Sequence, residues 1–292
     1  GYGDTVRYRS QGASRAAQHG AVAVLLRSVG PTGLRTPHTG SLRYDDDQPR
    51  IPAAGIPAED SDRLRRLTER GLPVRLRLRM QARFLPEAQS ANLLAEVRGR
   101  ERPEEIVLIG GHIDSWDVGT GAMDDGGGCA MVWEAARLIR SLGLRPRRTV
   151  RVVLFTNEEN GLRGGRAYSE AHSKEPHVLA FEADSGAFKP LGFGYTGPES
   201  GRETVEGVAR LLAALGPLAV EGEGRGADTG PVIEATGAPA ASLRVDGERY
   251  FVYHHTPADT IDRLRREDVA DGAAAIAALA YVVADLPARL GQ

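Results

Sequence analysis

Several short segments of this sequence carry histidines or carboxylates, the side chains that bind metal ions through nitrogen and oxygen. They are His112-Ile113-Asp114, Asp124-Asp125, Glu158-Glu159, Asp184 and His254-His255. Each segment alone has an ordinary explanation, since acidic pairs at a helix start favour the helix dipole and adjacent glutamates are usually solvated. Gathered in one place, however, the carboxylates would repel one another unless a positive charge lay between them. Neither lysine of the chain, Lys174 or Lys189, adjoins these segments, so a metal ion is the expected counter-charge.

The ligand types and their number favour two zinc ions. Nitrogen and oxygen ligands without thiolates suit zinc, with manganese or cobalt as substitutes. One catalytic zinc takes three protein ligands, so two histidines and three carboxylates fit two metals about 3.5–4 Å apart that share a carboxylate. The glycine-rich stretch Gly110–Gly128 contains no lysine or arginine and can turn tightly enough to return Asp124 to His112. At strand periodicity, Asp114 shares a face with His112, where it can accept the spare imidazole N–H.

The segments that must position these residues alternate between strands and helices. Apolar runs predict strands at residues 92–99, 105–114, 149–159, 177–185 and 238–245, and amphipathic patterns predict helices at 125–142, 163–172, about 200–216 and 267–286. This alternation predicts an α/β fold with a mostly parallel central sheet flanked by helices. Sites in such sheets form at the carboxyl ends of the strands, where the acidic segments lie.

The first part of the chain has a different pattern, and we place a domain boundary between residues 88 and 89. Residues 21–29 form a buried strand pattern, and a helix is expected at 59–70. Residues 74–80 alternate Arg75, Arg77 and Arg79 with apolar residues, which predicts a strand with one solvent-facing side rather than a binding patch. Domains are therefore expected at 1–88 and 89–292.

Composition excludes several classes of function. The formal net charge of −2 gives no basic field for nucleic acid or an anionic membrane. The longest apolar run, Gly272–Ala284, is shorter than the ~20 residues that cross a bilayer. Cys129 is the only cysteine, which excludes an internal disulfide, and its apolar surroundings favour a buried structural role over a nucleophilic one. No signal peptide is recognisable, so the residues leave the localisation unknown.

Four motifs resemble the di-zinc aminopeptidase and glutamate carboxypeptidase family of metallopeptidases. They are "GGHIDSWDVGTGAMDDGGG", "LFTNEENG", "EADSGAF" and "FVYHHTPADTID". Residues 36–60 resemble the protease-associated domain inserted in some members. The resemblance implies that residues 1–88 are a protease-associated-like domain, incomplete at its start, and that residues 89–292 are the catalytic domain. Family members have further catalytic-domain residues before the insert, so we expect the chain to be part of a longer protein.

The resemblance also implies roles for the residues of the motifs. His112 and Asp184 would bind one zinc, Glu159 and His255 the other, and Asp124 would bridge the two. Two more side chains would serve the reaction: Asp114 would orient His112, and Glu158 would be the general base. A cis peptide bond is implied between Asp124 and Asp125.

His254 departs from the pattern, because many members have tyrosine directly before the last histidine ligand. One branch of the family has two histidines there. If the segment is extended, the neighbouring side chains of His254 and His255 diverge, and only one of them can bind the same metal. We expect His254 to donate a hydrogen bond to the oxyanion in place of the tyrosine. The alternative is that His254 only packs against its loop.

The resemblance implies a zinc-dependent exopeptidase that hydrolyses dipeptides or short peptides and works as a secreted or periplasmic homodimer. A non-catalytic, receptor-like relative with the same fold is one alternative, and a glutaminyl cyclase-type acyltransferase is another. The complete ligand set argues against both. A two-metal phosphohydrolase is disfavoured because no arginine or lysine stands beside the motifs to bind phosphate.

Overall fold

The computed structural model describes residues 2–83 and 85–292. The chain divides into two compact units, which we describe separately. One unit contains Gly1–Gln89, Trp116–Gly119 and Phe251–Ala258, and the other contains Ser90–Ser115, Thr120–Tyr250 and Asp259–Gln292. The main division therefore falls at residues 89 and 90, and two short segments from later in the chain belong to the first unit.

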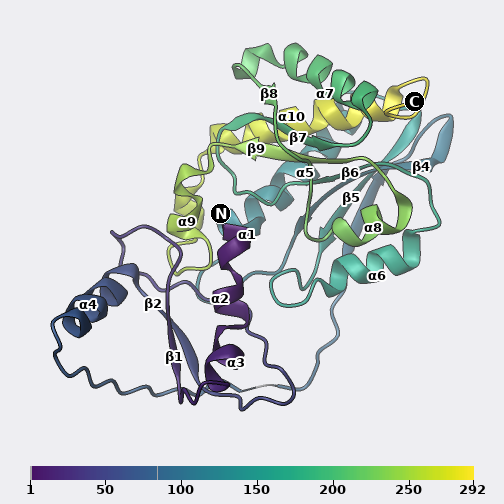
Figure 1. Cartoon of the computed structure of the whole chain (residues 1–292). Helices are drawn as coiled ribbons and strands as arrows, with labels where there is room; N and C mark the ends of the chain where they lie inside the picture. Colours follow the sequence, from purple (N-terminus) through teal and green to yellow (C-terminus); the bar gives the residue numbers. More distant parts are fainter. Residues whose placement is uncertain (1, 84) are drawn as a thin grey trace. The chain divides into compact units, whose positions relative to one another are not determined.

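The second unit is built on a seven-stranded sheet (Figure 1). Its order across the sheet is β3 (Leu93–Val97), β5 (Arg148–Phe155), β4 (Arg102–His112), β6 (His177–Glu182), β9 (Ala240–Val245), β7 (Pro190–Thr196) and β8 (Ala219–Val220). The central strands β5, β4, β6 and β9 are parallel. Strand β3 pairs antiparallel with β5, and β7 pairs antiparallel with β9 and parallel with β8. The expected α/β class is confirmed, with a sheet that is mixed because its outer strands reverse direction.

Helices cover both faces of this sheet. On one face α5 (Gly127–Ser141) packs against α10 (Arg266–Asp285), which also contacts α7 (Glu199–Leu211). On the other face α6 (Arg163–His172) packs against α8 (Gly230–Thr236) (Figure 1). Coverage of both faces explains why β5 is buried along its whole length and ends in four consecutive apolar residues rather than alternating ones.

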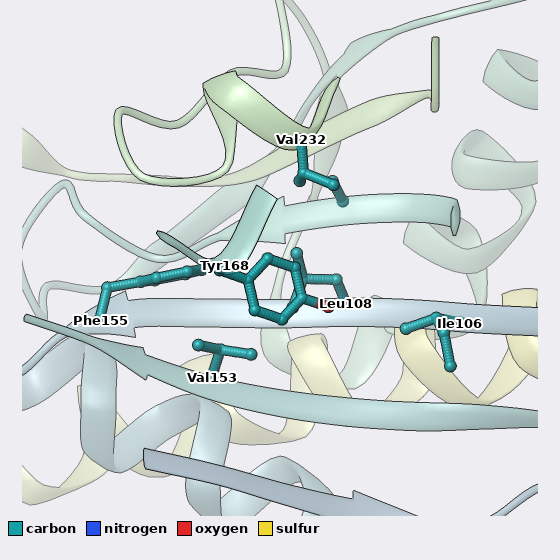
Figure 2. Packing of buried hydrophobic residues seen from close by; sticks show 7 residues of the cluster. Ile106, Leu108, Val153, Phe155, Tyr168 and Val232 are labelled. Atoms are coloured by element: carbon teal, nitrogen blue, oxygen red, sulfur yellow. The ribbon is translucent and has the colours of Figure 1, made fainter. Parts of the chain in front are cut away.

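A hydrophobic cluster joins the central strands to α6 and α8 (Figure 2). Its members are Ile106, Leu108, Val153, Phe155, Tyr168, Ala180 and Val232. The rings of Phe155 and Tyr168 meet edge to face with centroids 5.8 Å apart, a favoured geometry for aromatic pairs. Each fully buried large apolar side chain stabilises the fold by about 1.5–3 kcal/mol, so this cluster fixes the strands whose ends carry the acidic segments.

The first unit contains a small parallel sheet of β1 (Val24–Arg27) and β2 (Ala53–Ile56). Three short N-terminal helices, α1 (Tyr2–Thr5), α2 (Arg7–Ser10) and α3 (Gly12–Ala17), precede it, and α4 (Ala58–Glu69) follows β2. The strand predicted at 21–29 is therefore present in shorter form, and the helix predicted at 59–70 is present within one residue at each end.

The strand predicted at residues 74–80 is wrong, because this segment has no regular structure. The alternation of its residues suggested one buried and one solvent-exposed face, yet Leu76 and Leu78 are 62% and 40% exposed. A strand requires hydrogen bonds to a neighbouring strand, and within the described residues this segment has none. Alternation in sequence indicates which side chains would share a face but does not supply the partner.

No helix among the described residues is long and apolar enough to span a membrane.

Candidate metal centre

The carboxyl ends of β4, β5 and β6 lie side by side in the second unit. His112, the last residue of β4, pairs with Phe155, the last residue of β5, and Gly110 of β4 pairs with Glu182, the last residue of β6. Glu158 and Asp184 follow the ends of β5 and β6 within three residues. The strands therefore deliver a histidine and two acidic segments to one edge of the sheet.

The glycine-rich loop after β4 turns back on itself and returns Asp124 to His112. Gly121 adopts a left-handed conformation, with φ at 64°, and a Cβ there would lie 2.4 Å from the Cβ of Ser115. The turn Ala122–Gly126 follows, in which Asp124 and Asp125 have non-helical dihedral angles and are joined by a cis peptide bond. The result is a distance of 3.1 Å between Nε2 of His112 and Oδ1 of Asp124.

The imidazole of His112 lies between two carboxylates on one side and a carbonyl on the other. Nε2 is 3.1 Å from Asp124 Oδ1 and 3.5 Å from Asp184 Oδ1. Nδ1 is 2.9 Å from the backbone oxygen of Asp114, to which it can donate. In that tautomer, the Nε2 lone pair faces carboxylate oxygens. Such an arrangement requires either a proton on Nε2 or a cation between the ring and the carboxylates, and a metal ion suits it.

Asp114 orients His112 through its backbone rather than through its side chain. Its carboxylate Oδ1 is 3.9 Å from Nδ1 of His112, too far for a hydrogen bond. The carboxylate instead accepts the backbone N–H groups of Glu158 at 3.0 Å and Glu159 at 3.3 Å. This corrects the expected contact, and it means that Asp114 connects the loop after β4 to the glutamate pair after β5.

Two groups of side chains in the second unit have the spacing of metal sites. His112, Asp124 and Glu159 offer ligand atoms within 4.8 Å of one another, and so do His112, Asp125 and Asp184. Asp125 belongs to one of the candidate segments, although the resemblance implied no ligand role for it. Its carboxylate accepts the backbone N–H of His112 at 3.1 Å, so Asp125 also fixes the end of β4. The donors are nitrogen and oxygen only, a set that suits zinc, manganese or cobalt.

The electrostatics of the site show the same surplus of negative charge. Burial lowers the pKa of His112, but the contacts with Asp124 and Asp184 outweigh burial and raise it well above its usual value. Burial raises the pKa of Glu158 to about 8, with Asp184, Glu159 and Asp124 adding to the effect and His112 opposing it. Burial and the neighbouring carboxylates also raise the pKa of Asp125. These carboxyl groups favour protonation in the absence of another cation.

Three residues near this centre were not singled out in the sequence analysis. The carboxylate of Asp259 accepts the backbone N–H groups of Met123 and Asp124. Asp228 is fully buried, and Glu158 and His112 affect its pKa. Burial raises the pKa of Tyr250 well above its usual value, and Asp124, Asp184, Asp125 and Glu159 add to the effect. Only Asp259 had a sequence signal, since it belongs to the last motif, in "TPADT".

His254 and His255 belong to the first unit, where both are buried. Nδ1 of His255 is 3.1 Å from the backbone oxygen of Thr39, whose N–H donates to the His255 carbonyl at 3.0 Å. The extended segment assumed for these residues is wrong. Helix α9 (Tyr250–Tyr253) directly precedes them, and His255 is left-handed, with φ at 57°. Their rings therefore stack at 3.6 Å instead of diverging.

Comparisons with known proteins place this geometry in a family. Residues 92–280 match the model of peptidase family M28. Carboxypeptidase Q of Mus musculus is 44% identical over 292 residues, an alignment that covers 99% of this chain and 62% of the relative. Carboxypeptidase Q of Homo sapiens is 43% identical over 291 residues, with 99% and 61% covered. The chain thus spans about three fifths of the length of these curated relatives.

Solved structures of other proteins also resemble this chain. The crystal structure of a peptidase M28 precursor from Shewanella amazonensis has a TM-score of 0.86 and 38% identity, and the match covers 99% of this chain and 66% of that one. A zinc aminopeptidase from Bacillus subtilis has a TM-score of 0.65 and 22% identity, with 92% and 65% covered. At that level of identity the second likeness shows the fold alone.

Proposed function

Since this chain belongs to peptidase family M28, we propose that it is the hydrolytic part of a zinc-dependent exopeptidase that cleaves dipeptides or short peptides. The observation that carries the proposal is the position of His112, whose Nε2 faces Asp124 at 3.1 Å and Asp184 at 3.5 Å. The relatives named carboxypeptidase Q, which are 43–44% identical to this chain, support the same class of reaction.

We assign the metal ligands as the motifs imply. His112 and Asp184 would bind one zinc, Glu159 and His255 the other, and Asp124 would bridge them. The proximity of Asp124 and Glu159 to His112 supports this assignment. The contact of His255 Nδ1 with the Thr39 carbonyl supports it too, because metal-binding histidines commonly have a backbone carbonyl on one ring nitrogen that fixes the orientation of the ring. When bound, the two zinc ions would lower the pKa of water and polarise the peptide carbonyl.

Glu158 would act as the general base. It would take a proton from the attacking water and deliver it to the leaving amine. Burial raises its pKa to about 8 in the metal-free centre, and bound cations would lower that value towards the working range of a base at neutral pH. Asp114 would allow Glu158 and Glu159 to have different roles. Its carboxylate accepts both of their backbone N–H groups and so fixes the turn between them.

Two side chains are candidates for the donor that stabilises the oxyanion. His254 is the candidate from the motif, as the neighbour of the proposed ligand His255. Tyr250 is the candidate from the second unit, because its phenol has a pKa that burial and the charges of Asp124, Asp184 and Glu159 raise. A raised pKa keeps the phenol protonated and therefore able to donate.

The remaining features of the complete protein are proposed on the resemblance. Residues 1–88 would be the protease-associated-like domain, and residues 89–292 the catalytic domain. The protein would be a homodimer, the commonest closed assembly, and would work in a secreted or periplasmic location.

The test is an activity panel on the full-length protein. Dipeptides and aminoacyl-anilides would be assayed with added zinc, after chelation, and after zinc is restored. Hydrolysis that disappears with chelation and returns with zinc is the expected result. A protein that binds zinc but hydrolyses no member of the panel would favour the non-catalytic, receptor-like relative. Cyclisation of an N-terminal glutamine without peptide hydrolysis would favour the glutaminyl cyclase-type acyltransferase.

A further inference from the structure

Glu158 and Glu159 lie in a short loop between β5 and α6, residues 156–162, which we call the glutamate loop. Two of its residues, Asn157 and Leu162, have left-handed backbones, with φ at 62° and 53°. This conformation is unfavourable for any residue with a Cβ, and more so for leucine than for asparagine. Strained backbones persist only where the surrounding contacts hold them, so the contacts at the ends of this loop are important.

The side chain of Asn92 connects the two ends of the glutamate loop. Its Oδ1 accepts the backbone N–H of Thr156 at 3.0 Å, and its Nδ2 donates to the backbone oxygen of Gly164, in the first turn of α6, at 2.9 Å. The N–H of Gly164 in turn donates to the carbonyl of Thr156 at 2.9 Å. The three residues therefore form a closed ring of hydrogen bonds at the base of the loop.

The ring of hydrogen bonds leaves no room for a side chain at position 164. A Cβ on Gly164 would lie 2.3 Å from the carbonyl oxygen of Thr156 and 2.5 Å from Oδ1 of Asn92. Contacts this short cannot form unless one of the neighbours moves away. Glycine is therefore required where the amide of Asn92 meets the start of the helix.

The direction of β3 explains how Asn92 reaches the glutamate loop. Asn92 directly precedes β3, which pairs antiparallel with β5 so that Leu93 lies opposite Leu154. In an antiparallel pair the start of one strand lies beside the end of the other, so Asn92 is at the carboxyl end of β5. A parallel strand in the same place would bring its last residue there instead. The reversed edge strand thus delivers Asn92 to the edge of the sheet that carries the acidic segments.

Contacts inside the glutamate loop are weaker or act only on its middle. The carbonyl of Glu158 accepts the N–H groups of Gly161 and Leu162, but both distances are 3.4 Å, longer than an ordinary hydrogen bond. The carboxylate of Asp114 holds the backbone of the two glutamates without reaching the ends of the loop. Asn92 adds two hydrogen bonds of ordinary length that connect the loop to both β5 and α6.

We propose that Asn92 is a positioning residue for the reaction, because by closing the glutamate loop it holds Glu159 as a zinc ligand and Glu158 as the general base. This inference rests on the proposed functions of the two glutamates. Asn92 acts only through the backbone of the loop. Residues that orient metal ligands in this way typically contribute about 10- to 100-fold to metal affinity or activity.

The experiment compares three variants with wild-type full-length protein. Asn92→Ala removes both hydrogen bonds of the side chain. Asn92→Asp can still accept the N–H of Thr156, but it places a carboxylate oxygen against the carbonyl of Gly164, to which it cannot donate. Gly164→Ala displaces the amide of Asn92 although Asn92 itself is still present. Calorimetric titration of metal-free protein with zinc, thermal unfolding, and kcat and KM at saturating zinc are measured for each variant.

The expected result is a loss at one of the two zinc sites. In all three variants, the affinity for one zinc ion should fall about 10- to 100-fold, while the affinity for the other stays near the wild-type value. At saturating zinc, kcat should fall about 10- to 100-fold with KM within about twofold, because the general base is displaced while the remaining site is intact. A residue that only stabilised the fold would neither confine the loss to one zinc ion nor lower the kcat of folded, zinc-loaded protein.

The matched control is Ser90→Ala. The Oγ of Ser90 lies 2.8 Å from the hydroxyl of Thr156, but this contact is exposed and involves no backbone group of the loop. The control should keep wild-type zinc affinity and kcat. Wild-type zinc affinity and kcat in both Asn92 variants would overturn the inference, and so would equal weakening of both zinc ions or loss of the fold in both.

Glu158→Gln and Glu159→Gln, measured in parallel, separate this inference from the proposed function. An active Glu158→Gln together with a Glu159→Gln that keeps both zinc ions would contradict the proposed function of the loop. If both glutamate variants behave as proposed while the Asn92 variants are normal, only the role of Asn92 is wrong.

Discussion

The carboxylate of Asp259 accepts the backbone N–H of Asp124 at 3.1 Å, although 135 residues separate the two in sequence. Its other oxygen accepts the N–H of Met123 at 2.6 Å. Asp259 therefore holds the turn that carries the proposed bridging ligand, and it does so with charge-assisted hydrogen bonds, the stronger kind.

Replacing Asp259 should weaken metal binding although Asp259 is not a proposed ligand. Asp259→Ala removes both acceptors, so Asp124 loses its fixed position beside His112. Mutation of a residue that supports a metal ligand in this way typically lowers the metal affinity about 10- to 100-fold. Calorimetric titration of metal-free protein with zinc measures the change. Asp262→Ala, an exposed neighbour in the same segment, is the control, and equal affinities in the two variants would contradict the prediction.

The number of bound metal ions tests whether Asp124 bridges two of them. Protein prepared in excess zinc should contain about two zinc ions per chain. Asp124→Ala should lower that value at both sites, because it removes the shared ligand, and His112→Ala should lower it at one. Elemental analysis of the three proteins decides the point. A wild-type value of one that Asp124→Ala leaves unchanged would exclude a bridging role.

Glu158 and Glu159 should differ in role despite being neighbours. Glu158→Gln removes the proton acceptor and should lower kcat by about 10²–10⁴-fold while zinc stays bound. Glu159→Gln should weaken zinc binding first, and activity should fall with it. Zinc content and kcat are measured on the same preparations of each variant. Equal zinc loss in both, or near wild-type turnover in Glu158→Gln, would reverse or remove this assignment.

The oxyanion donor can be identified by comparing Tyr250→Phe with His254→Ala. The variant that removes the true donor should lose about 10²–10³-fold in kcat with little change in zinc content. Tyr253→Phe serves as the control for a buried tyrosine in the same segment. If Tyr250→Phe and His254→Ala both turn over normally, neither residue stabilises the oxyanion. If His254→Ala loses zinc while His255→Ala keeps it, the ligand is His254.

The stability of the metal-free protein and the additional stability gained from zinc should change in opposite directions as pH rises. Without metal, the pKa of Glu158 is raised from 4.5 to about 8, that of Asp228 from 3.8 to about 9, and that of His112 above 6.5. A raised folded-state pKa means that the folded protein binds protons more tightly than the unfolded chain. Stability should therefore fall as pH rises from about 5 to 9.

Zinc binding releases those protons, so the affinity for zinc, and with it the stabilisation by zinc, should increase over the same range. Thermal unfolding at pH 5 and pH 9, with chelator and with zinc, measures both trends. A chelated protein that is more stable at pH 9 than at pH 5 would contradict the first of them.

Local periodicity was enough to predict most elements of the second unit. Helix α6 begins and ends at the predicted residues, Arg163 and His172, and strand β4 ends at His112 within the predicted run. Both rest on patterns of apolar residues that neighbours in sequence determine. The acidic segments could be placed at strand ends for the same reason.

Contacts between distant segments could not be predicted in this way. Nothing in the sequence near residues 74–80 shows that this alternating run lacks a strand to pair with. The carboxylate of Asp114 binds the N–H groups of Glu158 and Glu159 instead of the adjacent His112 ring, because the end of β5 lies closer to it in space. The stacking of His254 on His255 depends on one left-handed residue that no pattern indicated.

The sequence by itself thus determined the α/β class, the family motifs and which residue types meet at the carboxyl edge of the sheet. Only the tertiary structure decided which atoms meet there and which supporting residues surround them. The carboxylate of Asp259, for example, reaches the backbone of Asp124 across 135 residues of sequence. The physical reason is that strand and helix patterns follow from adjacent side chains, whereas the position of a buried carboxylate follows from the packing of whole elements.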